Sequence, residues 1–327
     1  MLNDKTILIT GGTGSFGKKF TETLFKNYKP KKVIIFSRDE FKQYEMAKTF
    51  PYPKYPIRYF LGDIRDKSRL YRAFDGVDYV VHAAALKQVP ALEYNPMEAV
   101  KTNVLGGDCI VEAAIDNNVK KVVALSTDKA VNPVNLYGAT KLVAEKVFIA
   151  ANAYAGNKVK FSVVRYGNVM GSRGSVIPYF MNLKREGVKE FPITDERMTR
   201  FWITLEESVQ LVLTALENSV GGECFVPVIP SMKMTDLALA IESECTFKRI
   251  GIRPGEKIHE TLVSEDEARS TKIFKNNYII LPQFHENESI LKVYKDCPNV
   301  DDGFIYRSDT NNQWLTIDKL KQMAQLV

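Results

Sequence analysis

Side chains that can exchange protons gather in one stretch of this chain. Thr127, Asp128 and Lys129 place a hydroxyl, an acid and an amine side by side, and Tyr137 and Lys141 follow with three residues between them. An acid and an amine become a general acid and a general base when burial or neighbouring charges shift their pKa values. The stretch therefore predicts proton-transfer chemistry, with Thr127, Asp128, Lys129 and Tyr137 as the catalytic candidates.

The elements around this stretch would bring those side chains to a ligand. The apolar run 121–125 predicts a buried parallel strand, and residues 142–148 have helical spacing. Tyr137 and Lys141 then share one helix face, because residues four apart in a helix lie one above the other. The hydroxyl, acid and amine would stand at the carboxyl end of the strand, where open α/β sheets bind their ligands. The competing interpretation is that Tyr137 and Lys141 serve only packing and solubility.

A glycine-rich turn near the N-terminus predicts a dinucleotide site. A short β-branched strand at 5–10 leads into Gly-Gly-Thr-Gly-Ser-Phe-Gly, and a helix pattern begins at Lys18. Glycines spaced Gly-x-x-Gly-x-x-Gly let such a turn tighten, and the backbone N–H groups at the helix start can bind a pyrophosphate. The expected cofactor-binding residues in the turn are Gly11, Thr13, Gly14, Ser15, Phe16 and Gly17.

The end of the second predicted strand, at 32–36, bears on which cofactor is bound. NAD enzymes usually place an acid there to hold the ribose 2′-hydroxyl, whereas this chain has Ser37 and Arg38, followed by Asp39 and Lys42. Arg and Lys pair with a 2′-phosphate, so we expect NADP and assign these four residues to its binding. The alternative is that Arg38 and Lys42 are solvated charges at a helix start.

Two further strand ends belong to the same predicted site. A third strand at 57–61 is followed by Gly-Asp-Ile, in which Asp63 would cap a helix that starts near Lys67. A fourth strand ending at residue 82 leads into three alanines, and Ala83 would let the backbone pass close to a ribose or nicotinamide. Lys87 comes next, either to meet a phosphate or sugar or to be an ordinary surface lysine.

The glycine turn and the Tyr-x-x-x-Lys pattern, preceded by a Ser and a Thr, together resemble the extended branch of the short-chain dehydrogenase/reductase superfamily. The resemblance implies that Tyr137 is the acid/base on a substrate hydroxyl. It also implies that Lys141 lowers the pKa of Tyr137 and binds the nicotinamide ribose. Asp63, beside Ile64, is implied to contact the adenine ring, so both residues join the expected cofactor site.

A narrower resemblance covers nearly the whole chain and is weakest after about residue 265. Five segments are similar to the inverting UDP-N-acetylglucosamine 4,6-dehydratases: Ser-Thr-Asp-Lys-Ala, Asn-Leu-Tyr-Gly-Ala-Thr-Lys, Arg-Tyr-Gly-Asn-Val, Arg-Met-Thr-Arg-Phe-Trp and Arg-Pro-Gly-Glu-Lys. Retaining hexose dehydratases show Thr-Asp-Glu where this chain has Thr-Asp-Lys. The resemblance implies a hydro-lyase that oxidises C4 transiently, removes water across C5–C6 and inverts C5, as the first step toward pseudaminic acid.

The same resemblance implies which residues bind UDP-N-acetylglucosamine. Asn168 would contact the sugar nucleotide, Arg253 the diphosphate and Glu256 the uridine ribose. Lys87 and Thr194 complete the expected substrate-binding set.

The expected chemistry assigns opposite protonation states to two neighbours. Tyr137 would take the C4 hydroxyl proton, and Lys129, as the base at C5, must be neutral. We expect burial, Lys141 and the nicotinamide cation to lower the pKa of Lys129. Asp128, as the acid at the C6 hydroxyl, must be protonated, which requires desolvation. A structural ion pair between Asp128 and Lys129 is the alternative, and we set it aside because adjacent residues at a strand end seldom pair.

Two other classes of function remain open. A UDP-sugar C4 epimerase would need no Asp–Lys pair. A non-catalytic sensor of nucleotide sugars or of redox state would need no acid–base groups, and the intact Tyr137 and Lys141 argue against it.

The alternation of strands and helices predicts an α/β fold, namely a Rossmann-type doubly wound parallel sheet with a smaller interleaved α/β substrate domain. After about Ser172 the alternation loosens and prolines punctuate shorter elements. We expect residues 1–170 and 203–222 to form the NADP-binding domain. Residues 171–202 and 223–327 would form the nucleotide-sugar-binding domain.

The composition and net charge limit which kinds of partner we expect. The 327 residues are 45% hydrophobic and 26% charged, which is ordinary for a globular enzyme. The net charge of +6 is spread along the chain, so we expect neither nucleic acid nor membrane as a partner. The three histidines and four cysteines show no ligand spacing, so no metal is expected. We expect a cytoplasmic protein, since no signal peptide or long apolar run is evident. We also expect a homo-oligomer, and the tail around Trp314 is suited to dock either onto the body of the same chain or onto a partner subunit.

Overall fold

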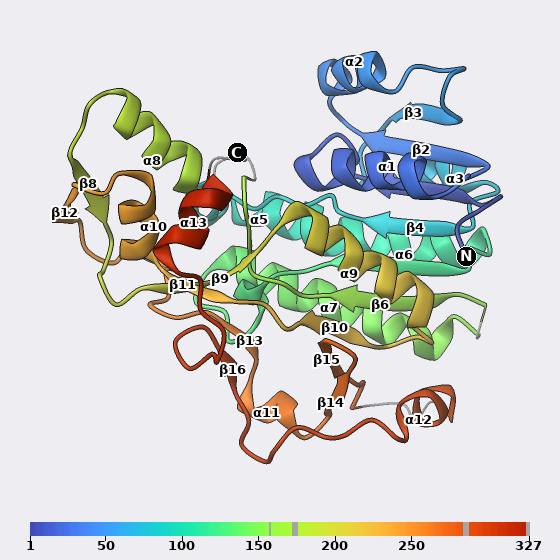
Figure 1. Ribbon diagram of the computed structural model, residues 1–327. Helices are drawn as coiled ribbons and strands as arrows, with labels where there is room; N and C mark the ends of the chain where they lie inside the picture. Colours follow the sequence, from blue (N-terminus) through green and yellow to red (C-terminus); the bar gives the residue numbers. More distant parts are fainter. Residues whose placement is uncertain (157, 172–175, 284–287, 325–327) are drawn as a thin grey trace.

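The computed structural model describes residues 1–156, 158–171, 176–283 and 288–324 (Figure 1). Within them, one large sheet has the strand order β14-β15-β10-β6-β5-β4-β1-β2-β3. The seven strands from β10 to β3 pair in parallel, and β15 and β14 join antiparallel at one edge. The predicted Rossmann-type sheet is therefore confirmed. Its strands are β1 (Thr6–Thr10), β2 (Lys32–Ser37), β3 (Ile57–Leu61), β4 (Tyr79–His82), β5 (Lys121–Leu125), β6 (Lys160–Val164), β10 (Cys224–Pro227), β14 (Thr271–Phe274) and β15 (Asn277–Ile280).

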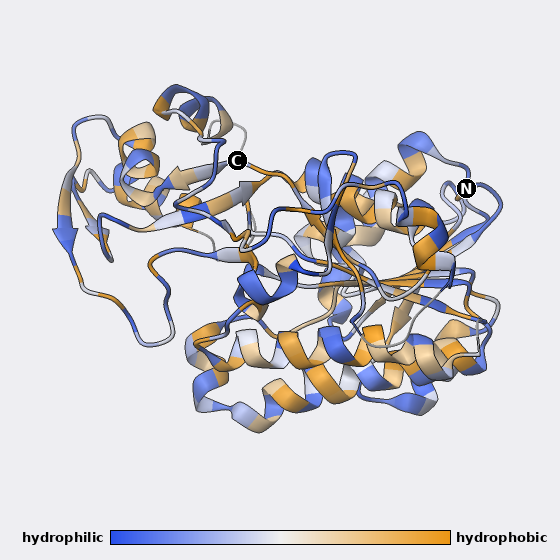
Figure 2. Ribbon diagram, turned by 90° about the horizontal axis from the view of Figure 1, so that it is seen from below, coloured by the Kyte–Doolittle hydropathy of each residue, from blue (hydrophilic) through white to orange (hydrophobic). Residues whose placement is uncertain are grey.

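Helices cover both faces of this sheet (Figure 1). The helices α3, α6 and α7 contact one another in a row, and α1 contacts α9. Figure 2 shows that the helices carry hydrophilic and hydrophobic residues, as expected of helices that bury one face against a sheet. Their bounds are α1 (Ser15–Asn27), α2 (Glu40–Thr49), α3 (Lys67–Phe74), α4 (Val89–Tyr94), α5 (Pro96–Ala99), a π-helical turn (Val100–Leu105), α6 (Gly106–Asp116), α7 (Leu136–Tyr154) and α9 (Leu205–Asn218).

A second hydrophobic core lies outside the large sheet. It includes Phe180, Phe191, Trp202 and Leu237, all buried, and it is separate from the cluster inside the Rossmann sheet. Strands of the small sheets β11-β9-β7 and β12-β8 contribute to it, whereas the buried residues of the third small sheet, β13-β16, belong to the cluster inside the Rossmann sheet. The remaining elements are a 3-10 turn (Asp128–Ala130), β7 (Asn168–Val169), α8 (Val176–Arg185), β8 (Glu190–Ile193), β9 (Thr199–Ile203), β11 (Ser231–Lys233), α10 (Met234–Ile241), β12 (Thr246–Arg249), β13 (Thr261–Val263), α11 (Glu265–Ala268), α12 (Glu288–Tyr294), β16 (Tyr306–Arg307) and α13 (Ile317–Ala324).

The border between the two parts is more interleaved than expected. Strands β10, β14 and β15 lie in the range 223–327 that we assigned to sugar binding, yet they extend the large sheet. Strand β10 pairs with β6, where Cys224 lies opposite Val163. The end of the Rossmann sheet therefore does not coincide with residue 223. Ser172, near which we expected the alternation to loosen, lies outside the described residues.

The segment 159–169 contributes to two different sheets. β6 ends at Val164, and Asn168 and Val169 leave the large sheet to pair with Trp202 and Ile203 of β9. A side chain at Gly167 would place its Cβ 2.6 Å from the Cβ of Phe201, so only glycine allows this close crossing. The crossing carries Asn168 from one sheet to the other.

None of the described helices is both long and apolar enough to cross a membrane. In the same described residues, no cluster of three or more His, Cys, Asp or Glu side chains could hold a metal ion.

Candidate active site

The glycine turn has the backbone that a bound pyrophosphate requires. Gly11 follows β1 with a φ of +65°, and a Cβ there would come 2.8 Å from the backbone N of Ala84. A Cβ at Gly17 would come 2.4 Å from the carbonyl oxygen of Gly12. No side chain caps the start of α1, so the N–H groups of its first turn remain available to an anion. The turn therefore fits the phosphates of a dinucleotide.

A cavity of about 980 Å³ opens beside this turn. All the residues expected to bind the cofactor line it, except Asp63. Thr127, Lys129 and Asn168 line it as well. The structure thus brings the glycine turn and the proton-exchanging stretch, which are far apart in sequence, to one cavity.

The residues at the end of β2 pair with one another. The Arg38 guanidinium lies 3.4 Å from Asp63 Oδ2, and Lys42 forms an ion pair with Asp39. Asp39 also caps α2, because its Oδ1 accepts a hydrogen bond from the backbone N of Lys42 at 2.9 Å. Burial raises the pKa of Asp63, but hydrogen bonds from Arg65 and the charge of Arg38 outweigh burial and hold that pKa below its usual value.

One expectation for Asp63 is wrong. The cap of α3 is Asp66, whose Oδ1 accepts a hydrogen bond from the backbone N of Arg69 at 3.0 Å. Asp63 lies before the cap and instead bonds Arg65. The sequence offers two aspartates three residues apart, and the helix begins one turn later than the first of them would require.

The proton-exchanging stretch is locked to the start of α7. Asn135 caps α7 by accepting a hydrogen bond from the backbone N of Gly138 at 2.8 Å. A Cβ at Gly138 would lie 2.0 Å from the carbonyl oxygen of Lys129, so the 3-10 turn packs directly against the helix. This contact brings Lys129 next to Tyr137. It also gives a structural reason for the glycine after Tyr137, a signal in the sequence that we had not used.

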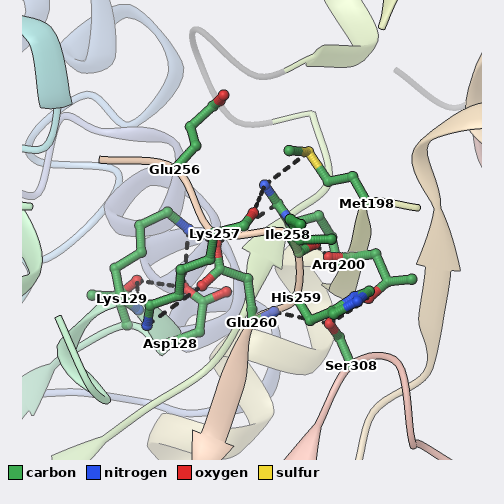
Figure 3. A network of polar contacts seen from close by, with 12 residues as sticks. Asp128, Lys129, Met198, Arg200, Glu256, Lys257, Ile258, His259, Glu260 and Ser308 are labelled. Atoms are coloured by element: carbon green, nitrogen blue, oxygen red, sulfur yellow. Dashed lines mark hydrogen bonds and ion pairs between the residues drawn. The ribbon is translucent and has the colours of Figure 1, made fainter. Parts of the chain in front are cut away.

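Asp128 and Lys129 form an ion pair, contrary to expectation. Lys129 Nζ lies 3.0 Å from Asp128 Oδ1, which also accepts a hydrogen bond from Thr127 Oγ1 at 2.8 Å. Successive side chains of a strand point to opposite faces, but the 3-10 turn at 128–130 removes that alternation. The two side chains then lie together, as Figure 3 shows.

Only one member of this pair faces the cavity. Lys129 lines the cavity wall and its side chain is 27% exposed, whereas Asp128 is 0% exposed and is absent from the wall. The Oδ2 atom of Asp128 is buried without a hydrogen-bond partner in the described structure. Asp128 therefore does not touch a ligand in the cavity directly, and it can act on one only through its contact with Lys129.

The protonation of this pair differs in part from expectation. Burial lowers the pKa of Lys129, but the charges of Asp128 and Glu260 outweigh burial and raise that pKa above its usual value. The expected lowering is therefore wrong, because it set aside the ion pair with Asp128 and left out Glu260. Burial raises the pKa of Asp128, and the charge of Glu260 adds to the rise. The direction expected for Asp128 is the one found.

Tyr137 and Lys141 lie together on the wall, as their spacing predicted. Burial raises the pKa of Tyr137, and the charge of Lys129 and a hydrogen bond with Thr127 oppose the rise. Lys141 Nζ donates to the carbonyl oxygen of Leu125 at 2.6 Å, and burial lowers the pKa of Lys141 to about 8. In this structure Lys129, rather than Lys141, is the cation that lowers the pKa of Tyr137.

The residues expected to bind substrate fall into two groups. Lys87 and Asn168 line the cavity, and the Oδ1 atom of Asn168 is buried without a hydrogen-bond partner in the described structure, which suits a ligand donor. Thr194, Arg253 and Glu256 do not line it. Arg253 instead forms an ion pair with Glu256 at 3.0 Å.

Sequence reasoning missed Glu260. Its Oε1 atom lies 3.6 Å from Lys129 Nζ, and Figure 3 shows Asp128, Lys129 and Glu260 together. Arg200 and Lys257 also reach Glu260 within ion-pair distance. The charges Lys257 and Glu260, three residues apart directly after Arg-Pro-Gly-Glu, were the available signal.

Comparison with known proteins identifies similar chains. The model of a family described as "Polysaccharide biosynthesis protein" matches residues 7–282. A UDP-N-acetylglucosamine 4,6-dehydratase (inverting) of Campylobacter jejuni is 55% identical over 99% of this chain and 98% of its own length. A UDP-glucose 4-epimerase of Rickettsia canadensis is 47% identical over 86% of this chain and 84% of its own. The X-ray structure of Pen from Bacillus thuringiensis superposes with a TM-score of 0.90, at 37% identity, over 100% of this chain and 98% of its own.

Proposed function

The chain belongs to the polysaccharide biosynthesis protein family, and from this premise we propose that it dehydrates UDP-N-acetylglucosamine across C5–C6 and inverts C5. The product is UDP-2-acetamido-2,6-dideoxy-β-L-arabino-hex-4-ulose, the first intermediate toward pseudaminic acid. The observation that carries the proposal is that Lys129, Tyr137 and the glycine turn line one cavity. The 55% identity to the Campylobacter dehydratase over nearly the full length supports the same reaction.

The cofactor that suits the cavity is NADP. The glycine turn and the uncapped start of α1 would hold its pyrophosphate, Arg38 and Lys42 its 2′-phosphate, and Lys141 the nicotinamide ribose. When bound, the dinucleotide accepts a hydride from C4 and later returns a hydride to C6, so no net oxidation occurs.

The residues on the wall divide the proton transfers. Tyr137 removes the proton of the C4 hydroxyl as the C4 ketone forms, and the ketone makes the C5 proton acidic. Lys129, in its neutral form, takes the C5 proton. Asp128, whose Oδ1 lies 3.0 Å from Lys129 Nζ, is the nearest group that can hold the proton that Lys129 must first release. The pair then supplies a proton to the C6 hydroxyl, and water leaves as the C6–O bond breaks. Once C6 has received its hydride, the resulting enolate takes up a proton at C5 on the face opposite to the one from which the first proton left.

The remaining assignments extend this proposal. Asn168 and Lys87 would bind the sugar nucleotide inside the cavity. Arg253 would bind the diphosphate and Glu256 the uridine ribose, which requires their mutual ion pair to open, and Thr194 would complete the substrate site. We propose that the protein is a cytoplasmic homo-oligomer, and that residues 171–202 and 223–327, apart from the strands that join the large sheet, bind the nucleotide sugar.

Incubation with UDP-N-acetylglucosamine in heavy water tests the reaction. Mass and NMR analysis should show loss of water, the L-arabino 4-keto sugar and deuterium at C5. A D-xylo 4-keto sugar as the initial product would instead place the enzyme with retaining dehydratases. A C4 epimer without loss of water would favour the alternative that the protein is an epimerase. The similarity to the Rickettsia epimerase is the observation that supports this alternative.

Replacing Arg38 with Asp should shift the cofactor preference from NADP toward NAD. The substitution removes a charge-assisted hydrogen bond to the 2′-phosphate and adds repulsion, so the affinity ratio of NADP over NAD should fall by about 10- to 100-fold. Titration of the purified protein with each cofactor measures this ratio. Arg38→Ser, which adds no repulsion, should give a smaller shift, and Arg58→Asp on β3, outside the cavity wall, should give none. An unchanged ratio in Arg38→Asp would return Arg38 to the solvated-charge interpretation.

A further inference from the structure

The proposed reaction gives no role to a buried acid that lies beside Lys129. Glu260 precedes β13, is 2% exposed and does not line the cavity. Its backbone N donates to Ser308 Oγ at 3.0 Å, which fixes the main chain at this point. A charged side chain is almost never buried unless cations compensate it, so its neighbours show what it does.

Among the described residues, three cations lie within ion-pair distance of the Glu260 carboxylate (Figure 3). Its Oε1 lies 3.6 Å from Lys129 Nζ and 3.7 Å from Arg200 Nε, and its Oε2 lies 4.0 Å from Lys257 Nζ. The Oε2 atom is buried without a hydrogen bond in the described structure. The carboxylate therefore acts mainly through its charge.

Two of these cations are already committed to the backbone. The Arg200 guanidinium donates to the carbonyl oxygens of Thr199, Lys257 and Ile258. Lys257 Nζ donates to the carbonyl oxygen of Val131 at 2.5 Å. Lys129 is the one of the three that lines the cavity, and its amine is held by Asp128 on one hand and Glu260 on the other.

We propose that Glu260 is a positioning residue that holds the Lys129 amine at the cavity wall and sets the pH at which that amine becomes neutral. The mechanistic meaning rests on the proposed dehydratase function, in which Lys129 is the base. The electrostatic part rests only on the geometry of the cluster.

The two carboxylates beside Lys129 have different tasks. Burial raises the pKa of Glu260, but the charges of Lys129, Arg200 and Lys257 outweigh burial and lower it, so Glu260 remains an anion. Burial raises the pKa of Asp128, and Glu260 raises it further. When Lys129 gives up its proton, the acceptor is therefore Asp128, and Glu260 keeps the charge.

The pKa of Lys129 depends on the charged groups around it in the described structure. Asp128 and Glu260 raise its pKa, whereas burial and the charge of Arg200 lower it. Lys129 in turn lowers the pKa values of Lys257, Lys87 and Tyr137. Neutralising Glu260 removes one of the two anions and leaves every cation in place, so the pKa of Lys129 must fall.

Chemical labelling measures the protonation of the Lys129 amine directly, without an activity assay. Only the neutral amine reacts with acetic anhydride, so the rate of Lys129 acetylation, read by mass spectrometry against surface Lys189, follows its protonation. In Glu260→Gln the pH of half-maximal labelling should fall by about 1–3 units, the effect of one adjacent charge. Glu223→Gln removes another buried carboxylate, which bonds the backbone N atoms of Val220 and Gly221, and should leave the labelling of Lys129 unchanged.

Activity gives the second readout. The dehydration rate should rise with pH at a lower pH in Glu260→Gln than in the parent, with the KM for UDP-N-acetylglucosamine changed less than about twofold. Glu260→Asp, which keeps the charge but withdraws it from Lys129, should shift both readouts in the same direction by less. It also serves if Glu260→Gln does not fold.

Equal labelling profiles for the parent, Glu260→Gln and Glu260→Asp would overturn the inference, and so would an equal shift in Glu223→Gln. A parent protein that shows the labelling shift but does not dehydrate UDP-N-acetylglucosamine would overturn the proposed function and leave the role of Glu260 in the cluster intact. The two failures are therefore distinguishable.

Discussion

Lys129→Ala should slow dehydration by about 10²- to 10⁴-fold, the usual contribution of a general base. The C4 ketone should still form, because Tyr137 and the glycine turn are untouched. The block falls at C5, because Lys129 is an amine of the cavity lining that forms an ion pair with the buried acid Asp128. Substrate affinity should change little, since the residues proposed to bind UDP lie elsewhere.

The measurement separates the two half-reactions. Reduced nicotinamide should accumulate on mixing Lys129→Ala with UDP-N-acetylglucosamine, while exchange of the C5 hydrogen in heavy water should be lost. Lys129→Met, which keeps the length of the side chain, should behave in the same way, and Lys120→Ala, at an exposed ion pair with Asp78, should behave like the parent. Parent-like turnover in Lys129→Ala would show that the base is elsewhere.

Tyr137→Phe should stop the reaction one step earlier. Its hydroxyl is the group that takes the C4 proton, so loss of that hydroxyl should reduce C4 oxidation by about 10²- to 10⁴-fold. Neither reduced nicotinamide nor C5 exchange should then appear. The ring remains and the buried site stays filled, so the melting temperature should change little.

The matched control for Tyr137→Phe is Tyr166→Phe. Tyr166 is also buried and lines the same cavity, but it has no place in the proton transfers. Its variant should retain both half-reactions. If Tyr137→Phe accumulates reduced nicotinamide as Lys129→Ala does, the assignment of the first proton transfer to Tyr137 is wrong.

The features that sequence predicted well are those set by neighbouring residues. The glycine turn between β1 and α1 depends on a spacing within seven positions, and the shared face of Tyr137 and Lys141 depends on one helical turn. The buried strands of the sheet are continuous apolar runs, as parallel strands require. Each of these patterns determines the local structure by itself, without a contact from a distant segment.

The features that sequence did not predict depend on distant partners. Glu260 reaches Lys129 only because the segment at the start of β13 packs against the 3-10 turn. No local sequence pattern predicts that contact. The expected direction of the Lys129 pKa was wrong because the charge of Asp128, whose ion pair we had set aside, and the charge of the unforeseen Glu260 together outweigh burial. The return of β10, β14 and β15 to the large sheet is likewise a pairing of segments far apart in the chain.

The contact between Gly138 and Lys129 limits how this enzyme can be redesigned. A single methyl group at residue 138 would collide with the carbonyl oxygen of Lys129, so the main chain beside one proton-handling side chain is in direct contact with the start of the helix that carries the other. Their spacing therefore depends on this main-chain contact. Engineering for a sugar with other substituents would therefore keep residues 127–141 as a unit and vary other residues that line the cavity, such as Lys87 and Asn168.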